Sequence, residues 1–248
     1  MTITRTVRYR CRNGGEGRAE LLDDGTLRTI EGAPAASIAE VELLAPVLPS
    51  KIIGIGLNYR AHAEEMKKKL PEEPLMFLKP STAVLDPGQP IVRPAGYERV
   101  DYEGELAVVF GRRARRVRAA EALDYVAGFT CLNDVTVRDL QIKDVQYTRA
   151  KGFDSFAPLG PCLASGLDPS DLAIVTRVDG EVRQRSSTAD LIFSVPALIE
   201  AVTRVMTMLP GDIISTGTPP GVGQVVPGSV VEIEIAGIGV LRNPVISE

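Results

Sequence analysis

Short runs of apolar, mostly β-branched residues recur along the chain from Lys51 onward, and they constrain the fold more than any other feature of the sequence. The runs read KIIGIG, LAVVF, AIVTRVDG, DIISTG and SVVEIEI, and Gly, Pro and Asp separate them. Short apolar runs between turn-forming residues are typical of β-strands. We therefore expect an α+β fold that is dominated by sheet and has few helices.

The N-terminal residues predict a smaller β unit. Within ELLDDGTLRTI, Asp24 and Gly25 are a hairpin signal, and the proline-interrupted stretch VELLAPVLPS follows. We expect residues 1–49 to form a small N-terminal β appendage and residues 50–248 to form the main domain. A chain of 248 residues can bury one full core but not two large ones.

Three segments indicate helices. They are the region from His62 to Lys69, a short polar helix from Arg115 to Ala122, and Ser194 to Met208, where apolar residues recur every three or four positions. The basic run RRARRVR has no aromatic neighbours in the sequence, which favours a solvated turn over a nucleic-acid site. The charged stretch MKKKLPEE, from Met66 to Glu73, is either an exposed loop or a mobile flap.

Composition excludes several classes of function. The formal net charge of -4 offers no basic face for nucleic acid, and no apolar run approaches the about 20 residues that span a membrane. Cys11, Cys131 and Cys162 are odd in number and far apart, so we expect neither a disulfide framework nor a thiolate zinc site, and a cytoplasmic location fits. The single histidine, His62, excludes zinc sites that need two or three imidazoles.

Carboxylates gather in two segments. In VDYEGELAVVF, Glu103 and Glu105 are two residues apart on an expected strand, so both should point to one face, with Asp101 nearby on the same face. Taken alone, this pattern also fits the polar outer face of an edge strand. In CLNDVTVRDLQ, Asp134 follows an apolar stretch, and it is either a further ligand or the N-cap of a helix. Three carboxylates would suit Mg²⁺, or Mn²⁺ in its place.

Other motifs carry candidate catalytic and binding groups. In GIGLNYRAHAEEM, a helix would place His62 and Glu65 one turn apart, so that the carboxylate could orient the imidazole as a general base, although a solitary histidine can also be structural. RAKGFDSFAPLGP holds Lys151, which either meets an anionic substrate or is simply exposed. STGTPPGVG offers N–H groups and the hydroxyls of Thr216 and Thr218 to a carboxylate, but it lacks the G-K-[ST] of a phosphate loop.

Five of these motifs, in order and spacing, resemble the fumarylacetoacetate hydrolase family. They are GLNYRAH, YEGEL, NDVTVRDLQ, RAKGFDSFAP and STGTPPGVG, and the likeness runs from about Lys51 to the C-terminus. The resemblance implies a roll of layered mixed β-sheets, which makes residues 50–248 the catalytic domain. It also implies a homodimer and a flap over the site, which would fall on Glu64 to Glu73.

The resemblance also assigns roles to residues. It implies that the metal, Mg²⁺ or Mn²⁺, is held by Glu103, Glu105 and Asp134. It implies that catalysis uses the His62–Glu65 dyad and Lys151, assisted by Arg138 and Gln141, which follow Asp134 at helical spacing. The expected substrate-binding residues are Tyr59, Gly217 and Thr218.

The reaction stays open at this stage. The chain is similar to the shorter bacterial members of the family, which implies a divalent-metal-dependent hydrolase that cleaves a C–C bond in an acylpyruvate-type 2-oxo acid and releases pyruvate. The alternatives are an isomerase/decarboxylase of an aromatic-catabolic 2-oxo or 2-hydroxydienoic acid, an oxaloacetate decarboxylase, and a 2-oxo acid binding protein without turnover. Fold and metal site alone do not choose among them.

Overall fold

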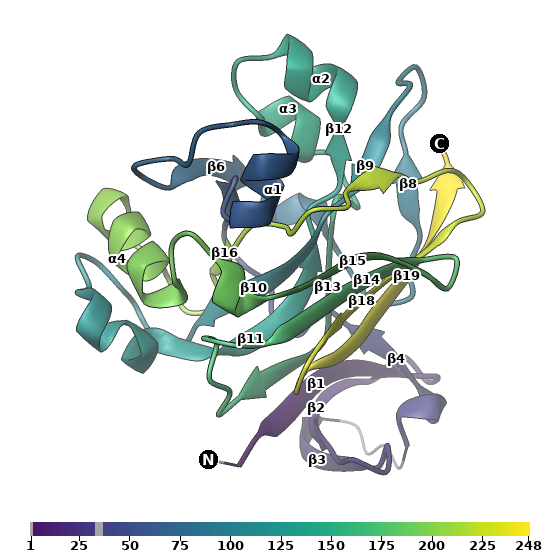
Figure 1. The fold of residues 1–248 in the computed structure, drawn as a ribbon. Helices are drawn as coiled ribbons and strands as arrows, with labels where there is room; N and C mark the ends of the chain where they lie inside the picture. The colour runs from purple at the N-terminus through teal and green to yellow at the C-terminus, as the bar shows by residue number, and fades with distance from the viewer. Residues whose placement is uncertain (1, 33–36) are drawn as a thin grey trace.

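A mixed sheet of eleven strands is the largest feature of the computed structural model, which describes residues 2–32 and 37–248 (Figure 1). Nine strands follow one another across the sheet, while β4 pairs with β1 and β7 pairs with β13. In spatial order the nine are β3 Leu27–Gly32, β2 Glu16–Leu21, β1 Thr4–Cys11, β13 Ala157–Ser165, β11 Val126–Asn133, β10 Gly104–Phe110, β16 Ile213–Ser215, β5 Ile52–Gly56 and β6 Leu75–Lys79, and the other two are β4 Val41–Leu44 and β7 Val84–Leu85.

Two smaller sheets complete the strand content of the described residues. A five-stranded sheet packs on the central strands of the large one, and its order is β15 Glu181–Ser187, β14 Ala173–Val178, β18 Val230–Ile235, β19 Gly239–Ser247 and β8 Ile91–Arg93. A three-stranded sheet has the order β12 Thr136–Val137, β9 Val100–Tyr102 and β17 Gly223–Gln224. The expected α+β fold of layered mixed sheets is confirmed.

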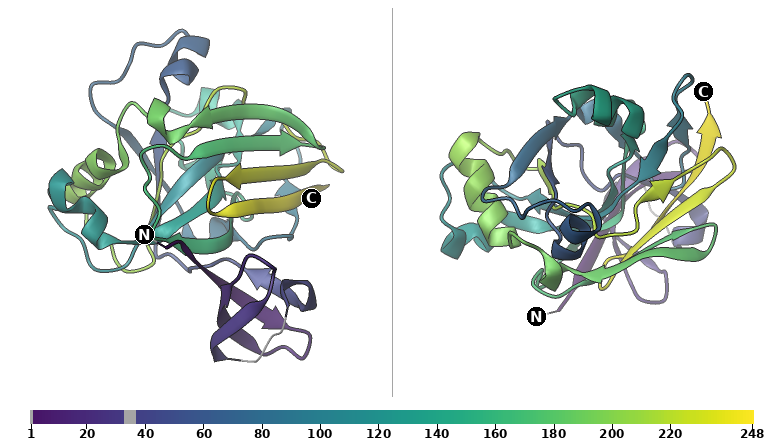
Figure 2. Two further views of the ribbon diagram at one scale, coloured as in Figure 1. Left: turned by 60° about the horizontal axis from the view of Figure 1, so that its bottom comes forward. Right: turned by 45° about the horizontal axis from the view of Figure 1, so that its top comes forward.

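The helices are short and lie at the margins of the sheets (Figures 1 and 2). The α-helices are α1 Arg60–Glu65, α2 Arg138–Lys143, α3 Thr148–Lys151 and α4 Val195–Val205, and the 3-10 helices are η1 Ile38–Glu40, η2 Ser81–Ala83, η3 Ala119–Tyr125 and η4 Thr188–Asp190. No helix in the described part of the chain is long and apolar enough to cross a membrane.

Strand β10 is buried along its whole length because both of its faces are covered. Leu106 and Val108 belong to the core shared with the five-stranded sheet, whereas Ala107 and Val109 belong to a second core on the opposite face. A strand that is buried on two faces needs apolar residues at consecutive positions rather than at alternating ones. This arrangement explains the unbroken run LAVVF and places β10 at the centre of the molecule.

The first strands extend the large sheet. β1 pairs with β2 on one edge and with β13 on the other, where Thr4 lies opposite Ser165. The hairpin expected at Asp24 and Gly25 joins β2 to β3, and Gly25 has a φ of +82° there, which suits glycine. Figure 2 (left) shows these purple strands projecting from the body. The boundary at residue 49 stays a prediction, although β1 shares a sheet with the rest of the chain.

The expected helix from Arg115 to Ala122 is wrong, and the structure has the 3-10 helix η3 a few residues later. The reason is tertiary: the Arg116 N–H donates to the carbonyl of Thr203, and the Arg115 guanidinium donates to the same carbonyl near the end of α4. These bonds replace the local ones that a helix would need. The other two helical segments are confirmed as α1 and α4, with α1 ending before Lys69.

Gly104, the first residue of β10, is required by the close approach of the five-stranded sheet. A Cβ at this position would lie 2.1 Å from Thr176 Oγ1, and its N–H donates to Gln184 Oε1 at 3.0 Å. We predict that Gly104→Ala lowers the free energy of unfolding in urea by about 1–3 kcal/mol, the usual cost of overpacking.

A second substitution tests the cause of that loss. The Thr176 hydroxyl has no hydrogen-bond partner, so Thr176→Ala removes the clashing oxygen without breaking a bond. The double variant should therefore recover part of the stability lost in Gly104→Ala. Strictly additive losses in the double variant would show that contact with Thr176 is not the cause.

Candidate active site

A cavity of about 390 Å³ opens where α1, β6 and α2 meet the start of β10. Its wall combines apolar residues with most of the polar groups that the sequence singled out. The polar and charged lining residues are His62, Lys68, Glu103, Glu105, Asp134, Arg138, Gln141, Lys151 and Thr218, and Leu75, Phe77, Ile142 and Tyr147 are among the apolar and aromatic ones.

Strand pairing brings three carboxylates together. Gly104 lies opposite Asn133 in the antiparallel β10–β11 pair, and the Asp134 N–H donates to the Glu103 carbonyl at 2.9 Å. Asp134 therefore lies beside Glu103, and Glu105 lies two residues further along β10. Carboxylate oxygens of the three residues lie within 4.8 Å of one another, and all three residues are buried.

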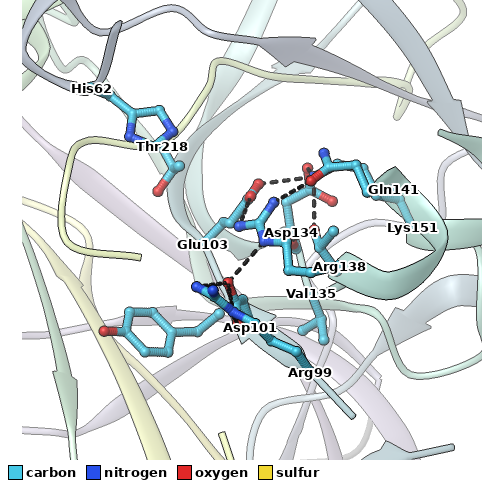
Figure 3. Close-up of polar contacts among 12 residues, drawn as sticks. His62, Arg99, Asp101, Glu103, Asp134, Val135, Arg138, Gln141, Lys151 and Thr218 are labelled. Carbon is cyan, nitrogen blue, oxygen red and sulfur yellow. Dashed lines mark hydrogen bonds and ion pairs between the residues drawn. The ribbon is translucent and has the colours of Figure 1, made fainter. Parts of the chain in front are cut away.

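Two cations hold Glu103. Lys151 Nζ donates to Glu103 Oε2 at 2.9 Å and to Asp134 Oδ2 at 2.5 Å, while Arg138 Nη2 donates to Glu103 Oε1 at 2.5 Å (Figure 3). Burial alone would raise the pKa of Glu103, but the charges of Lys151 and Arg138 hold it at about 2. The third Lys151 donor goes to Thr136 Oγ1 at 2.8 Å, so all three of its N–H groups are used.

Glu105 has only neutral donors in the described structure. Its Oε2 accepts from Ser215 Oγ at 2.6 Å and from the Gly217 N–H at 2.8 Å. Burial, followed by the charges of Asp134 and Glu103, raises the pKa of Glu105 well above its usual value. Three carboxylates, of which Glu105 has no cationic partner, are oxygen ligands that fit a hard divalent cation such as Mg²⁺ or Mn²⁺.

Helix α1 builds the expected dyad. His62 and Glu65 are one turn apart, and His62 Nδ1 lies 3.0 Å from Glu65 Oε2. A proton on Nδ1, assigned from this bond, leaves the lone pair of Nε2 free to accept another proton. His62 is buried and lines the cavity, whereas Glu65 is largely exposed. Figure 3 shows His62 beside Thr218, on the other side of Glu103 from Lys151 and Gln141.

The expected substrate-binding residues divide into two groups. Thr218 lines the cavity and donates to the Gly104 carbonyl at 3.0 Å. Tyr59 and Gly217 do not line it: the Tyr59 side chain is fully buried with an unpartnered hydroxyl, and the Gly217 N–H is taken by Glu105. Gln141 does line it, and its Oε1 accepts from Arg138 at 2.6 Å, which turns the amide N–H₂ to other partners.

The structure separates Asp101 from the three clustered carboxylates and excludes the alternative of a helix cap for Asp134. Asp101 does not join the carboxylate cluster, because its buried carboxylate is enclosed by Arg99 at 2.9 Å and Arg138 at 2.8 Å. Arg138 donates to Asp101 through Nε and to Glu103 through Nη2, so Asp101 lies next to the cluster without joining it (Figure 3). Asp134 is not a helix cap, since α2 begins after Val137 and has no side-chain cap.

A buried charge beside the carboxylates was not predicted from the sequence. Lys79 is fully buried at the end of β6, and its Nζ donates to Asp134 Oδ1 at 2.7 Å. Burial, with the charge of Lys151 acting the same way, lowers the pKa of Lys79 despite the opposing charge of Asp134. The available signal was a lysine inside the otherwise apolar run LMFLKP.

The segment after α1 forms part of the cavity wall. Met66, Lys68 and Pro71 line the cavity, and most of the side chains between residues 64 and 73 are exposed. The Lys68 side chain makes no hydrogen bond or ion pair with the described residues, unlike Arg138 and Lys151. That this segment is a mobile flap stays a prediction.

The geometry thus defines a class of enzyme site: three carboxylates that fit a hard cation and, in the same cavity, a histidine that is paired with a glutamate. Residues 51–246 match the family model described as fumarylacetoacetate (FAA) hydrolase C-terminal. The chain belongs to the fumarylacetoacetate hydrolase family of enzymes, as its five motifs predicted.

Three relatives show which reactions occur among similar proteins. The crystal structure of 5-carboxymethyl-2-hydroxymuconate delta-isomerase from Mycobacterium smegmatis is 46% identical, with a TM-score of 0.91 over 98% of this chain and 99% of that one. The 4-hydroxyphenylacetate degradation bifunctional isomerase/decarboxylase of Escherichia coli is 45% identical over 210 residues, which are 82% of this chain and 49% of that protein. The mitochondrial oxaloacetate tautomerase FAHD2A of Bos taurus is 40% identical over 247 residues, covering 92% of this chain and 79% of that protein.

The expectation that Glu105 is a metal ligand can be tested without measuring turnover. We predict that Glu105→Gln lowers the affinity for Mn²⁺ by roughly tenfold or more in calorimetric titration of metal-free protein. The free energy of unfolding without metal should not fall, because the amide keeps an acceptor for Ser215 and removes a charge that burial disfavours. Glu64→Gln, which removes an exposed carboxylate outside the cavity, is the matched control. Native Mn²⁺ affinity in Glu105→Gln would remove Glu105 from the ligand set.

Proposed function

We propose that this protein is a divalent-metal-dependent enzyme that moves protons on a small 2-oxo acid, as an isomerase or tautomerase does. One observation carries the proposal: His62, the histidine of the dyad, and the three clustered carboxylates line the same cavity. Glu103, Glu105 and Asp134 would hold Mg²⁺ or Mn²⁺, and the bound cation would act as a Lewis acid toward the substrate's 2-oxo group.

The protein's own residues would carry the proton transfer. His62 Nε2 would take a proton from the carbon next to the 2-oxo group, and Glu65 would stabilise the charged imidazole. The imidazole would return the proton to the 2-oxo oxygen in a tautomerase, or to a further carbon of the conjugated substrate in an isomerase. The free amide N–H₂ of Gln141 is available to the negative charge that develops on the substrate. Lys151 would act mainly through its positive charge, because its three donors are already used.

The relatives support this reaction and a dicarboxylic substrate. The names of the three relatives state an isomerase, an isomerase/decarboxylase and a tautomerase. 5-Carboxymethyl-2-hydroxymuconate and oxaloacetate each carry more than one carboxylate. In this chain Lys68 lines the cavity and has no partner among the described residues, so it could bind a carboxylate at the far end of the substrate.

Hydrolysis of a C–C bond is the second candidate, favoured by the family match. The same His62 would then deprotonate a water that attacks the distal carbonyl of an acylpyruvate, and pyruvate would be released. A panel of 2-oxo acids and 2-hydroxydienoic acids assayed with Mg²⁺ separates the candidates when mass spectrometry identifies the product. If pyruvate accumulates from acetylpyruvate faster than any isomer forms, the protein is a hydrolase and the isomerase proposal is rejected. A signal that stops at one equivalent of substrate per protein would indicate a binding protein.

One substitution separates reactions that need a base from those that do not. We predict that His62→Ala slows tautomerisation, isomerisation or hydrolysis by roughly 10²–10⁴-fold, the usual contribution of a positioned general base. Decarboxylation of oxaloacetate should survive much better, because it requires chiefly an electron sink. The affinity for Mn²⁺ should be nearly unchanged, since His62 is not in the carboxylate cluster. Native rates of proton transfer in His62→Ala would show that the dyad is structural.

We also propose that the protein is a homodimer. Apart from the family expectation, the support is a groove formed by β6, the α2–α3 loop and the end of α4, where exposed apolar residues gather. β6 also ends the large sheet and has an unpaired edge. The exposed apolar residues of the groove are Leu75, Leu78, Val145 and Val205.

Light scattering tests this proposal. We expect a mass of two 26.6 kDa chains for the native protein and of one chain for Val145→Asp, which would bury a charge in the interface. Leu123→Asp, an exposed apolar position outside the groove, is the control and should remain a dimer. A native mass of one chain at working concentration would refute the proposal.

A further inference from the structure

Lys79 is a charged residue at a position where charge is unusual. It is the last residue of β6, its side chain is fully buried, and it does not line the cavity. An isolated buried ammonium is strongly disfavoured unless hydrogen bonds and an opposite charge compensate it. Lys79 therefore has no direct contact with a substrate bound in the cavity.

All three hydrogen-bond donors of Lys79 bind groups on residues at or next to the candidate site. Its Nζ donates to Asp134 Oδ1 at 2.7 Å, to the Lys151 carbonyl at 2.6 Å and to the Val135 carbonyl at 3.4 Å. Asp134 is therefore held by two lysines, Lys79 on Oδ1 and Lys151 on Oδ2. Two charged donors on different oxygens fix the plane of the carboxylate.

The bond to the Lys151 carbonyl orders a second element. Lys151 is the last residue of α3, a helix of four residues, which is too short to be stable without tertiary contacts. The Lys79 ammonium accordingly connects β6 to the end of α3 and to the residue that follows β11. One buried cation therefore contacts both the Asp134 carboxylate and the backbone from which the Lys151 side chain extends.

We propose that Lys79 is a positioning residue that orients Asp134 for the metal and anchors Lys151. The inference rests on the proposed metal site. The change in metal affinity when Lys79 is replaced separates a positioning role from that of a simple counter-charge. Removing a nearby positive charge would raise the affinity for a cation, whereas losing the orientation of Asp134 would lower it.

The experiment compares Lys79→Met with the native protein by calorimetric titration of Mn²⁺ into metal-free samples. We expect the affinity to fall by roughly 10–100-fold, the usual effect of losing a group that orients a metal ligand. At saturating Mn²⁺, kcat should fall with little change in KM, because Lys151 is displaced as well. Lys79→Gln, which keeps an N–H donor but no charge, should recover part of the affinity.

Lys51→Met is the matched control. Lys51 also pairs with a buried aspartate, Asp212, but neither residue lines the cavity. It should lose stability and keep native Mn²⁺ affinity. An unchanged or higher Mn²⁺ affinity in folded Lys79→Met overturns the proposal. Failure of both Lys79 variants to fold without metal also overturns it, because the lysine would then be required for folding. Absence of Mn²⁺ binding in the native protein would instead reject the proposed function.

Discussion

The crowding of three buried carboxylates is the constraint on which the rest of this structure depends. Glu103, Glu105 and Asp134 repel one another in a region that water does not reach freely. Lys151 and Arg138 compensate Glu103, and Lys79 and Lys151 compensate Asp134. Each of these cations lies on a different short element, so their ion pairs hold α2, α3 and β6 around the carboxylates. The packing of α2, α3 and β6 at this edge of the large sheet follows from the charges as much as from the apolar core.

The sequence predicted those features that depend on local pattern. Apolar runs predicted the sheets, the Asp24–Gly25 turn predicted a hairpin, and the E-x-E spacing placed Glu103 and Glu105 on one side of the chain. The sequence pattern left Asp134 as either a further ligand or a helix cap, and the family motifs favoured the ligand. Strand pairing across some thirty residues of sequence brings it beside Glu103. Order along the chain was therefore a better guide than any single motif.

The failures have tertiary causes. The helix expected from Arg115 to Ala122 was lost because its backbone and arginine groups bond to the end of α4. Asp101 has the same spacing as the two glutamates, yet the chain changes sheet after Tyr102, and two arginines enclose its carboxylate. Lys79 could not be recognised from composition, since its partners lie more than fifty residues away.

Helix α1 has a consequence for how the base is assembled. It has six residues, fewer than two turns, and its backbone geometry alone brings Glu65 to His62. Unwinding this helix would separate the imidazole from its carboxylate without altering either side chain. Any ligand that contacts His62 in its paired form must also favour the wound helix, and by thermodynamic linkage the wound helix must favour that ligand. Basicity at this site is thus a property of a short stretch of secondary structure as well as of a residue.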